Sequence, residues 1–473
     1  MDIIIKNNSM LISKEDSSFA KLLESTLSYT DKSKQYQLKR LGKTIWGRSS
    51  PEFKRLQQEV NGKLYEKSNS GEWIVNSAFF DYLVQEYPEF FKNANITDDR
   101  KETGEKIVLP WVNKPFDPRP YQEEAIELMM SNYRGVINFA TGLGKTLVAT
   151  HFIKRYKKKA LVVCPSDSVA KQFYNQFIEC FGKNKVGFYG GGKKKISDIT
   201  VAIAASATRN IEELRQADFG VVIFDEVHHT PASTFFEISQ GLSGVGKVFG
   251  LTATDYRSDG KDIMMTAGCG RVLIRRDIKW GVDNGFLATP YFIVREVNTG
   301  SRDFKDDKLK SYKEHVLNNQ IMKDRILNDA KSMIAAGKAV LVLVDEVAHG
   351  EELSKALGVP FATGEDKNSQ QYVEDLNSHK IQGLIGTDGK IGEGSDTKNV
   401  DVLILANFVA SKGPVIQCIG RSLRKQGIKT KALILDYIPM GSTMLKRHAL
   451  QRMEYYLEIT DKVKHVTVMD ATE

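Results

Sequence analysis

Short, uninterrupted runs of apolar residues alternate with helix-like segments over most of the chain. Runs of this kind predict strands of a parallel sheet that are buried on both faces, because a half-buried strand would alternate apolar with polar residues. Alternation of such strands with helices predicts doubly wound α/β architecture. The runs fall into two stretches, about 107–290 and about 315–440, which indicates two lobes. The clearest runs are 160–164, 221–224, 339–344, 402–405 and 432–435.

Polar, turn-rich residues separate the two stretches at Asn298–Asp303. Residues 1–105 differ from both stretches, with shorter mixed segments and several aromatics, and predict a small α+β domain. We therefore expect an N-terminal accessory domain and two α/β lobes joined by a linker. The expected boundaries are 1–105 for the accessory domain, 106–297 for the first lobe, 298–314 for the linker and 315–473 for the second lobe.

The composition is that of an ordinary soluble globular protein. Hydrophobic residues make up 41% of the 473 residues and charged residues 27%. No apolar run approaches the roughly 18 residues that a membrane span requires, and the start lacks a signal-peptide layout. The four cysteines, Cys164, Cys180, Cys269 and Cys418, lie far apart, which favours neither disulfides nor a zinc site. We expect a cytoplasmic, reducing environment and no membrane partner.

Positive charge is concentrated near the N-terminus. The formal net charge of the chain is +8, and residues 32–67 alone contain ten basic and three acidic side chains, a net charge of +7. The following residues, 68–105, contain three basic and eight acidic side chains. Tyr36, Trp46, Phe53 and Tyr65 interleave with the basic residues of the first segment. Basic residues that follow phosphates and aromatics that stack on bases favour DNA binding, although an ordinary small domain with core aromatics fits as well.

The strongest local motif is a glycine-rich loop between a predicted strand at 136–139 and a predicted helix at 147–156. Glycines allow the backbone N–H groups of such a loop to face phosphate oxygens, and the helix N-terminus adds positive potential. Lys145 would reach the β- and γ-phosphates of ATP, and the Thr146 hydroxyl would hold Mg²⁺. One departure is Phe139, which stands where the common pattern has glycine. The loop residues expected to bind nucleotide are Thr141, Gly142, Leu143, Gly144, Lys145 and Thr146.

Two carboxylates follow the apolar run 221–224. A carboxylate just past the end of a buried strand lies in the crevice where α/β folds bind ligands. Asp225 suits a Mg²⁺ contact, and Glu226 suits positioning of the attacking water as general base. His228 and His229 lack partners at metal-ligand spacing, so we expect no zinc site. Further upstream, Arg119 and Gln122 precede the loop, and a Gln side chain can recognise adenine through a bidentate amide contact.

The order of these motifs resembles superfamily 2 helicases of the Asp-Glu-x-His group. It runs Arg119–Gln122, Thr141–Thr146, Asp225–His228 and then Leu251–Thr254. The resemblance implies two RecA-like lobes, ATP and Mg²⁺ as cofactors, and coupling of ATP hydrolysis to nucleic-acid movement through the Thr252–Thr254 segment. A small domain ahead of two compact lobes is similar to bacteriophage branch-migration helicases of the UvsW kind, and more distantly to RecG and XPB.

The second lobe carries residues that resemble the last motif of this family. Gln417, Arg421 and Arg424 are spaced i, i+4 and i+7, so a helix would present them on one face towards a γ-phosphate. Such an arginine finger accelerates phosphoryl transfer by about 10³–10⁵-fold. By the same resemblance, Gly394 and Asp396 are expected near the ribose and these arginines.

Small and hydroxyl-bearing residues mark an expected nucleic-acid track. Hydroxyl groups and exposed backbone N–H groups suit phosphate contacts. By resemblance, the track comprises Pro165, Ser166, Gly191 and Ser206 in the first lobe and His349 and Thr387 in the second.

The sequence as a whole predicts an ATP-dependent DNA helicase or translocase that remodels forked and branched DNA, with roles in recombination and repair. Movement from 3′ to 5′ is implied by the resemblance. The alternatives are the motor subunit of a restriction system, an RNA helicase, and a nucleic-acid-binding scaffold with an inactive ATPase. Intact Lys145, Glu226, Arg421 and Arg424 argue against the scaffold.

Overall fold

A computed structural model covers the chain and describes most of its residues. Outside the description lie 14–16, 44–47, 228–231, 243, 254–261, 301, 306, 388–396, 398, 409–411, 426–428 and 468–473. The chain divides into two compact units. One comprises Met1–Phe139 and Gly144–Arg275, and the other Ala140–Leu143 and Arg276–Glu473. Among the described helices, none is long and apolar enough to cross a membrane.

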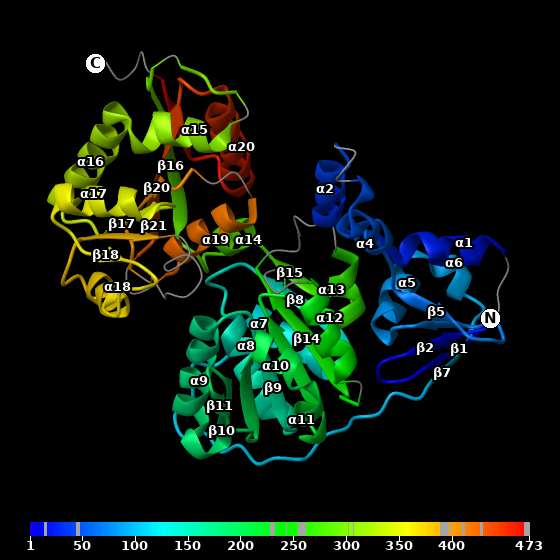
Figure 1. Cartoon of the computed structure of the whole chain (residues 1–473). Helices are drawn as coiled ribbons and strands as arrows, with labels where there is room; N and C mark the ends of the chain where they lie inside the picture. The colour runs from blue at the N-terminus through cyan, green and yellow to red at the C-terminus, as the bar shows by residue number, and fades with distance from the viewer. Residues whose placement is uncertain are drawn as a thin grey trace. The chain divides into compact units, whose positions relative to one another are not determined.

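The first unit begins with a five-stranded sheet of order β5-β6-β2-β1-β7 (Figure 1). Apolar residues alternate across it: Ile3 and Ile5 are buried in β1, whereas Asp2 and Ile4 are exposed. The sheet strands are β1 (Asp2–Ile5), β2 (Met10–Ile12), β5 (Tyr65–Lys67), β6 (Trp73–Val75) and β7 (Asn95–Asp98). Around it lie α1 (Ser17–Thr26), β3 (Ser28–Thr30), α2 (Lys32–Leu41), α4 (Pro51–Glu59), β4 (Asn61–Lys63), η1 (Ser77–Phe79), α5 (Phe80–Glu86) and α6 (Pro88–Phe91).

The N-terminal segment shares its apolar core with the first lobe. Met264 and Ala267 of α13 (Asp262–Cys269) belong to the same buried cluster as Phe79 of η1. The buried guanidinium of Arg134 donates to the carbonyl oxygen of Asn7 from Nη2, at 2.6 Å, and from Nε, at 3.2 Å. Apolar and polar contacts therefore fix these two parts of the first unit together.

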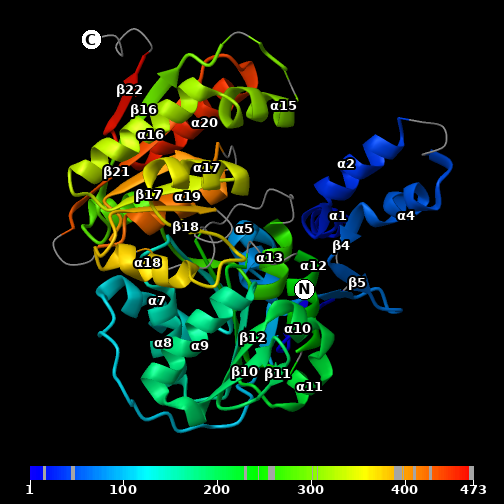
Figure 2. The same ribbon diagram turned by 60° about the vertical axis from the view of Figure 1, so that its left-hand side comes forward.

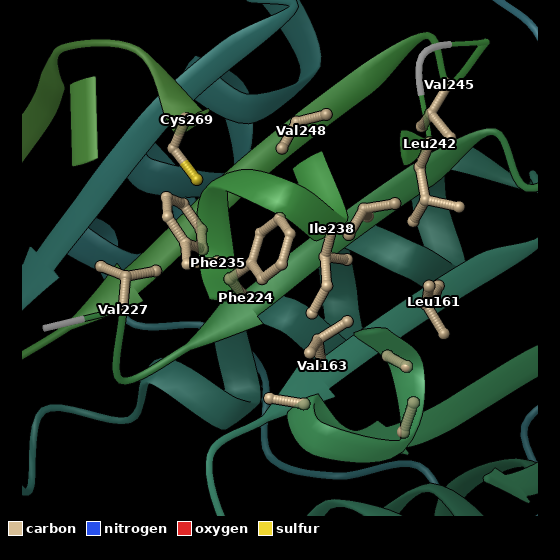
Figure 3. Packing of buried hydrophobic residues seen from close by; sticks show 14 of the residues in the cluster. Leu161, Val163, Phe224, Val227, Phe235, Ile238, Leu242, Val245, Val248 and Cys269 are labelled. Atoms are coloured by element: carbon tan, nitrogen blue, oxygen red, sulfur yellow. The ribbon is translucent and has the colours of Figure 1, made fainter. Parts of the chain in front are cut away.

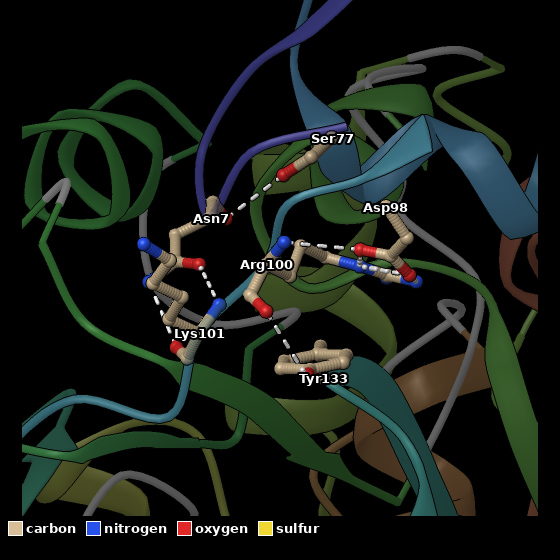
Figure 4. Close-up of polar contacts among 6 residues, drawn as sticks. All are labelled: Asn7, Ser77, Asp98, Arg100, Lys101 and Tyr133. Atoms are coloured by element: carbon tan, nitrogen blue, oxygen red, sulfur yellow. Dashed lines mark hydrogen bonds and ion pairs between the residues drawn. The ribbon is translucent and has the colours of Figure 1, made fainter. Parts of the chain in front are cut away.

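Figure 4 shows further polar contacts at this junction. The backbone N–H of Lys101 donates to the side-chain oxygen of Asn7 at 2.8 Å. Arg100 pairs with Asp98 at 2.6 Å, and its carbonyl oxygen accepts from the Tyr133 hydroxyl at 3.4 Å. The Arg100 guanidinium also lies 4.5 Å from the centroid of the Tyr133 ring, a cation–π contact. These contacts attach the chain segment that leaves the N-terminal sheet to the start of the first lobe.

The first lobe is built on an eight-stranded sheet of order β11-β10-β12-β9-β13-β14-β8-β15. The six strands from β10 to β8 are mutually parallel. Phe224, Phe235 and Ile238 pack between this sheet and α12 in the core that Figure 3 shows. The strands are β8 (Arg134–Phe139), β9 (Ala160–Cys164), β10 (Val186–Gly190), β11 (Lys193–Lys194), β12 (Ile199–Ile203), β13 (Val221–Asp225), β14 (Lys247–Thr252) and β15 (Val272–Arg276).

Helices connect these strands, as the alternating pattern predicts. The helices are α7 (Pro120–Ser131), α8 (Lys145–Tyr156), α9 (Asp167–Phe181), η2 (Lys183–Lys185), α10 (Ala204–Arg209), α11 (Ile211–Gln216) and α12 (Ala232–Gly241), with α13 as given above.

The second lobe is built on a seven-stranded, fully parallel sheet of order β18-β19-β17-β20-β21-β16-β22. Helices α16 and α20 pack against it (Figures 1 and 2). Its strands are β16 (Thr289–Val297), β17 (Val340–Val344), β18 (Phe361–Ala362), β19 (Gly383–Thr387), β20 (Val402–Ala406), β21 (Lys431–Pro439) and β22 (Val463–Val466). Its helices are α14 (Ile278–Asp283), α15 (Lys308–Tyr312), η3 (Lys313–Leu317), α16 (Gln320–Ala335), α17 (Val347–Leu357), α18 (Ser369–Asn377), α19 (Lys412–Ser422) and α20 (Thr443–Ile459). The predicted two-lobed α/β fold is confirmed.

The expected position of the linker is wrong. Strand β16 falls within the expected bounds of the first lobe, but it pairs along its whole length with β21 of the second sheet. The segment after it also belongs to the second unit, since the buried Thr299 hydroxyl lies 3.0 Å from Nδ1 of His315 and accepts from the N–H of Gly441. The two units meet along the chain near Arg275 instead. The remaining expected boundaries stay predictions.

Candidate nucleotide and nucleic-acid site

The candidate nucleotide residues meet at one edge of the first-lobe sheet. Strands β8, β14 and β13 are neighbours, with Thr252 opposite Asn138 and Asp225 opposite Leu251. Because these strands are parallel, their carboxyl ends lie along the same edge. The glycine-rich loop follows β8, and Thr252 and Asp225 end β14 and β13, so all three lie at the edge where α/β folds bind ligands.

The glycine-rich loop turns directly from β8 into α8. Gly142 and Gly144 have φ angles of 92° and 83°, in the left-handed region that favours glycine. A Cβ atom on Gly144 would lie 2.4 Å from Nε2 of Gln122, so a side chain has no room there. Helix α8 begins at Lys145, and its first N–H groups have no partners within the helix. The local geometry is that of an anion-binding loop.

Lys145 is held by two contacts inside the first lobe. Its Nζ donates to the carbonyl oxygen of Phe139 at 3.2 Å and pairs with Oε1 of Glu226, also at 3.2 Å. Both side chains are largely buried, and burial makes such a pair electrostatically stronger than one on the surface. The lysine and the candidate general base are therefore neighbours, as a shared role at one phosphate group requires.

Asp225 and Glu226 occupy an electrostatically unusual position. Asp225 is 5% exposed, and burial together with the neighbouring Glu226 charge raises the pKa of its carboxyl to about 8, although Lys145 acts in the opposite direction. Glu226 has a φ of 46°, a strained value for a residue with a side chain. A buried carboxylate that lacks full compensation fits a divalent cation. With the Thr146 hydroxyl it offers the hard oxygen ligands that Mg²⁺ prefers.

The candidate adenine residues stand at the start of α7. The backbone N–H of Arg119 donates to Oε1 of Gln122 at 2.9 Å, and Gln122 is buried against Gly144. The structure thus brings Gln122 to the phosphate loop. Phe116, which the sequence analysis did not select, is 89% exposed three residues before Arg119. An aromatic residue a few positions before a candidate base-recognising Gln is the sequence signal that could have identified it, since an aromatic face can stack on a base.

The first-lobe track residues lie along the other half of the same edge. Ser166 follows β9 and caps α9, Gly191 follows β10, and Ser206 lies in α10 directly after β12. Strands β10, β12 and β9 are parallel neighbours, so these positions and Pro165 share one edge. Gly191 is exposed with a φ of 55°, and Ser166 and Ser206 are partly exposed.

The second-lobe arginines differ from the expectation. Gln417 and Arg421 lie one turn apart in α19, with Gln417 buried and Arg421 partly exposed. The helix ends at Ser422, and Arg424 forms an isolated antiparallel bridge with Leu287 instead. The expected single helical face of three residues is therefore wrong for Arg424, because backbone pairing with the segment before β16 takes over from the helix.

The remaining second-lobe residues fall into three groups. Thr387 ends β19 at the carboxyl edge of the second sheet and is partly exposed. Gly394 and Asp396 lie outside the described residues, as do His228, His229 and Thr254. His349 is 1% exposed within α17, so its ring is inside the lobe and does not face a surface where a nucleic acid could contact it.

Burial of His349 predicts acid sensitivity of the fold. Within the described structure neither ring nitrogen has a hydrogen-bond partner, and burial lowers the pKa to about 4. The unfolded chain, with a pKa of about 6.5, therefore binds the proton more readily, so stability is lost as pH falls from about 6.5 towards 4. Between pH 7.5 and pH 5 this group should lower the free energy of unfolding by about 2 kcal/mol.

Denaturant unfolding of wild type and His349→Met at both pH values would measure this loss. Methionine does not titrate, so the variant should lose about 2 kcal/mol less stability than wild type over the same interval. Equal losses in the two proteins would show that His349 does not carry the effect.

Two parallel-sheet lobes, with a glycine-rich loop and an Asp-Glu pair at the carboxyl edge of the first, have the architecture of two RecA-like lobes. Residues 115–257 match the family model described as "Type III restriction enzyme, res subunit". The chain is 26% identical over 390 residues to a putative DNA 3′-5′ helicase Rad25 of Halobacterium salinarum, covering 80% of this chain and 62% of that protein. It is 24% identical over 416 residues to the ATP-dependent DNA helicase uvsW of Enterobacteria phage T4, covering 82% of this chain and 80% of that protein. The resemblance to superfamily 2 helicases is confirmed.

Solved structures support the fold. A fragment of a putative HsdR subunit of a type I restriction enzyme from Vibrio vulnificus has a TM-score of 0.56 and 22% identity, covering 75% of this chain and 70% of that one. The chain covers less than two thirds of the length of its Rad25 relatives. It covers 62% of the protein from Halobacterium salinarum and 58% of a second one from Haloarcula marismortui.

Proposed function

We propose that this chain is an ATP-dependent DNA helicase or translocase that unwinds or remodels forked and branched DNA, moving from 3′ to 5′. The observation that carries the proposal is the single edge of the first-lobe sheet. One half of it holds the glycine-rich loop with the Lys145–Glu226 pair, and the other half holds the hydroxyl and glycine positions that we expect to contact DNA. A shared edge gives ATP turnover a short structural route to DNA contacts.

ATP and Mg²⁺ would be held by this chain's own residues as follows. Gln122 and Arg119 would recognise adenine, and the loop from Thr141 to Thr146 would surround the phosphates. Thr146 and Asp225 would hold Mg²⁺, which neutralises the phosphate charge when bound. Glu226 would orient the attacking water and accept its proton. The ion pair between Lys145 and Glu226 must open for this, because Lys145 then faces the phosphates and frees the carboxylate.

In the second lobe, we assign Arg421 to the developing charge on the γ-phosphate, with Gln417 positioning it from the preceding turn of α19. Arg424 would support the same site from outside the helix, and Gly394 and Asp396 would lie near the ribose. Thr387 would contact a DNA phosphate, together with Pro165, Ser166, Gly191 and Ser206 of the first lobe. His349 would act as a core residue.

The N-terminal segment would supply the preference for branched DNA, because contacts to the DNA backbone give none. Helices α2 and α4 pack on each other. Lys39 and Arg40 are exposed on α2, and Lys43 and Arg48 are exposed between the two helices. Tyr36 is 70% exposed and its ring is available for stacking, whereas Tyr65 packs on Trp73 at 4.9 Å between centroids. Trp46 lies outside the described residues. Among the described aromatics of residues 32–67, Tyr36 is therefore the exposed one.

Charge removal should separate fork recognition from ATP turnover. The variant Lys39→Gln/Arg40→Gln/Lys43→Gln/Arg48→Gln should bind forked DNA more weakly. The slope of log K against log salt should fall by about 0.9 for each phosphate that the variant no longer neutralises. ATPase rates with no nucleic acid, single strands, duplex, forks and RNA would accompany the binding curves. In wild type, forks should stimulate most and RNA least.

Substitutions suit this test better than truncation near residue 106. Truncation would uncover Met264 and Ala267 and remove the Asn7 carbonyl that accepts from Arg134. A matched control changes four exposed lysines of the second lobe to Gln: Lys308, Lys331, Lys355 and Lys367. Stimulation by RNA alone, or an ATPase that ignores all nucleic acids, would contradict the proposed function. Unchanged fork binding in the variant that removes the four N-terminal charges would contradict only the role of the N-terminal segment.

A second candidate is the motor subunit of a restriction system. The description of the matching family model and the HsdR likeness favour it. The sequence outside the two lobes shows no evident nuclease signature of spaced Asp, Glu and Lys residues. Cleavage of duplex DNA by the purified chain with ATP and Mg²⁺ would support this candidate over the first.

A further inference from the structure

A cavity opens at the amino-terminal edge of the second-lobe sheet. Its volume is about 720 Å³, and most of its lining comes from residues at or near the starts of five parallel strands, with Met333 of α16 added. Lys338 precedes β17, Asp401 precedes β20, Lys431 begins β21 and Lys462 precedes β22. Thr387, by contrast, ends β19 at the carboxyl edge. The cavity therefore lies at the opposite edge of the sheet from the proposed DNA contact.

The lining has two chemical parts. The apolar part comprises Phe292, Ile293, Met333, Val402, Ala432, Leu433 and Val463. The charged part contains four lysines and two aspartates, with a formal net charge of +2: Lys338, Lys431, Lys462, Lys464, Asp401 and Asp461. A ligand that fills this space needs an apolar group for the cavity and negative charge around it.

The four ammonium groups outnumber the two carboxylates of the lining. Among the described residues, none of these lysines forms an ion pair with a carboxylate. The Asp401 carboxylate already accepts from the N–H of Ala339 at 3.0 Å. Lys431 and Lys462 lie 5.4 and 5.3 Å from the centroid of the Tyr291 ring. Positive potential at this edge is thus available to an acidic partner.

The cavity adjoins an open edge of the sheet. Strand β22 is the last in the strand order and, within the described part of the chain, pairs on one side only, with β16 (Figure 2). Val463 and Lys464 of this strand also line the cavity. An unpaired strand edge offers backbone N–H and C=O groups to an added extended segment.

We propose that this cavity and the edge of β22 bind an extended, acidic peptide segment of a partner protein. An apolar side chain of the peptide enters the cavity, carboxylates face the four lysines, and the peptide backbone pairs with β22. A peptide fits better than a nucleic acid, because the cavity floor is apolar and lysines lie over the Tyr291 ring that a base would need. This docking surface is separate from the ATP and DNA residues and goes beyond the proposed function.

Fluorescence anisotropy with the full-length protein tests the proposal. The probe is a labelled peptide of sequence Asp-Glu-Asp-Leu-Phe-Glu-Asp, compared with one in which Ser replaces Leu and Phe, and with a short oligothymidylate as competitor. We expect saturable binding of the apolar acidic peptide, weakened at least about 10-fold in Lys462→Glu/Lys464→Glu because attraction becomes repulsion. Met333→Trp, which fills the cavity, should weaken it similarly.

Two controls separate this docking from surface charge and from folding. Lys355→Glu/Lys367→Glu changes exposed lysines of the same lobe away from the cavity and should bind the peptide as wild type does. Basal ATPase activity should be unchanged in every variant, since none touches the candidate nucleotide site. The proposal is overturned by absence of saturable binding, by equal affinity for the Ser peptide, by full affinity in both cavity variants, or by efficient competition from oligothymidylate.

Discussion

Alanine in place of Lys145 should reduce DNA-stimulated ATP turnover by at least about 10²–10³-fold, the loss that follows removal of one preorganised group at a reacting centre. Nζ of Lys145 lies 3.2 Å from both the Phe139 carbonyl and the Glu226 carboxylate, so it is held at the mouth of the phosphate loop. Without it, the β- and γ-phosphates lose their positive partner, and Glu226 remains largely buried without its cation. Initial-rate ATPase assays at saturating DNA would measure the change.

Glu226→Gln distinguishes loss of chemistry from loss of binding. Glutamine keeps the shape and a contact to Lys145 but cannot accept a proton, so turnover should fall to a similar level while ATP still binds. Equilibrium binding of a fluorescent ATP analogue would measure whether the variant still binds the nucleotide. Lys183→Ala, at an exposed position of the same lobe, should leave both unchanged. Hydrolysis at the wild-type rate in either Lys145→Ala or Glu226→Gln would refute the assigned roles.

Arg421→Ala should lower kcat by about 10³-fold or more with a much smaller change in KM, because an arginine finger strengthens its contacts in the transition state. Gln417 lies one turn earlier in α19 and is buried, so packing of this turn fixes the position of Arg421. Arg421→Lys keeps the charge but loses the bidentate geometry and should recover only part of the rate.

Arg424→Ala should have a smaller effect than Arg421→Ala, since Arg424 follows the end of α19 and pairs through its backbone with Leu287. Lys425→Ala provides the matched control, an exposed neighbouring cation whose ammonium donates to the carbonyl of Gly285 at 2.6 Å. A kcat within a few-fold of wild type in Arg421→Ala would show that this arginine is structural.

The local sequence pattern determined the fold class and the local geometry of the candidate nucleotide site in the first lobe. The apolar runs at 160–164, 221–224 and 402–405 became β9, β13 and β20, with end points that differ by at most one residue. They could be predicted because a strand buried on both faces must be apolar throughout. The phosphate loop and the Asp-Glu pair were also local: a turn, a helix start and a strand end fix their geometry within a few residues.

The tertiary structure alone decided which elements share a sheet and which side chains are buried. Strand β16 joins the second lobe because it pairs with β21, a partner about 140 residues away that no local pattern identifies. His349 lies in the core although its sequence neighbours resemble a DNA-contact motif. The ion pair between Arg452 and Asp436, both almost fully buried, joins a helix to a strand and has no signature in the sequence.

The contacts of the N-terminal segment and the lining of the lysine-rich cavity also join residues that are distant in the sequence. Arg134 meets the carbonyl of Asn7 across more than a hundred residues, and the cavity draws its lining from the starts of five strands. Periodicity and motifs report what a short segment needs from its surroundings, such as burial, a turn or a cap. They do not report which distant segment provides it, because that choice depends on the free energy of packing the whole chain.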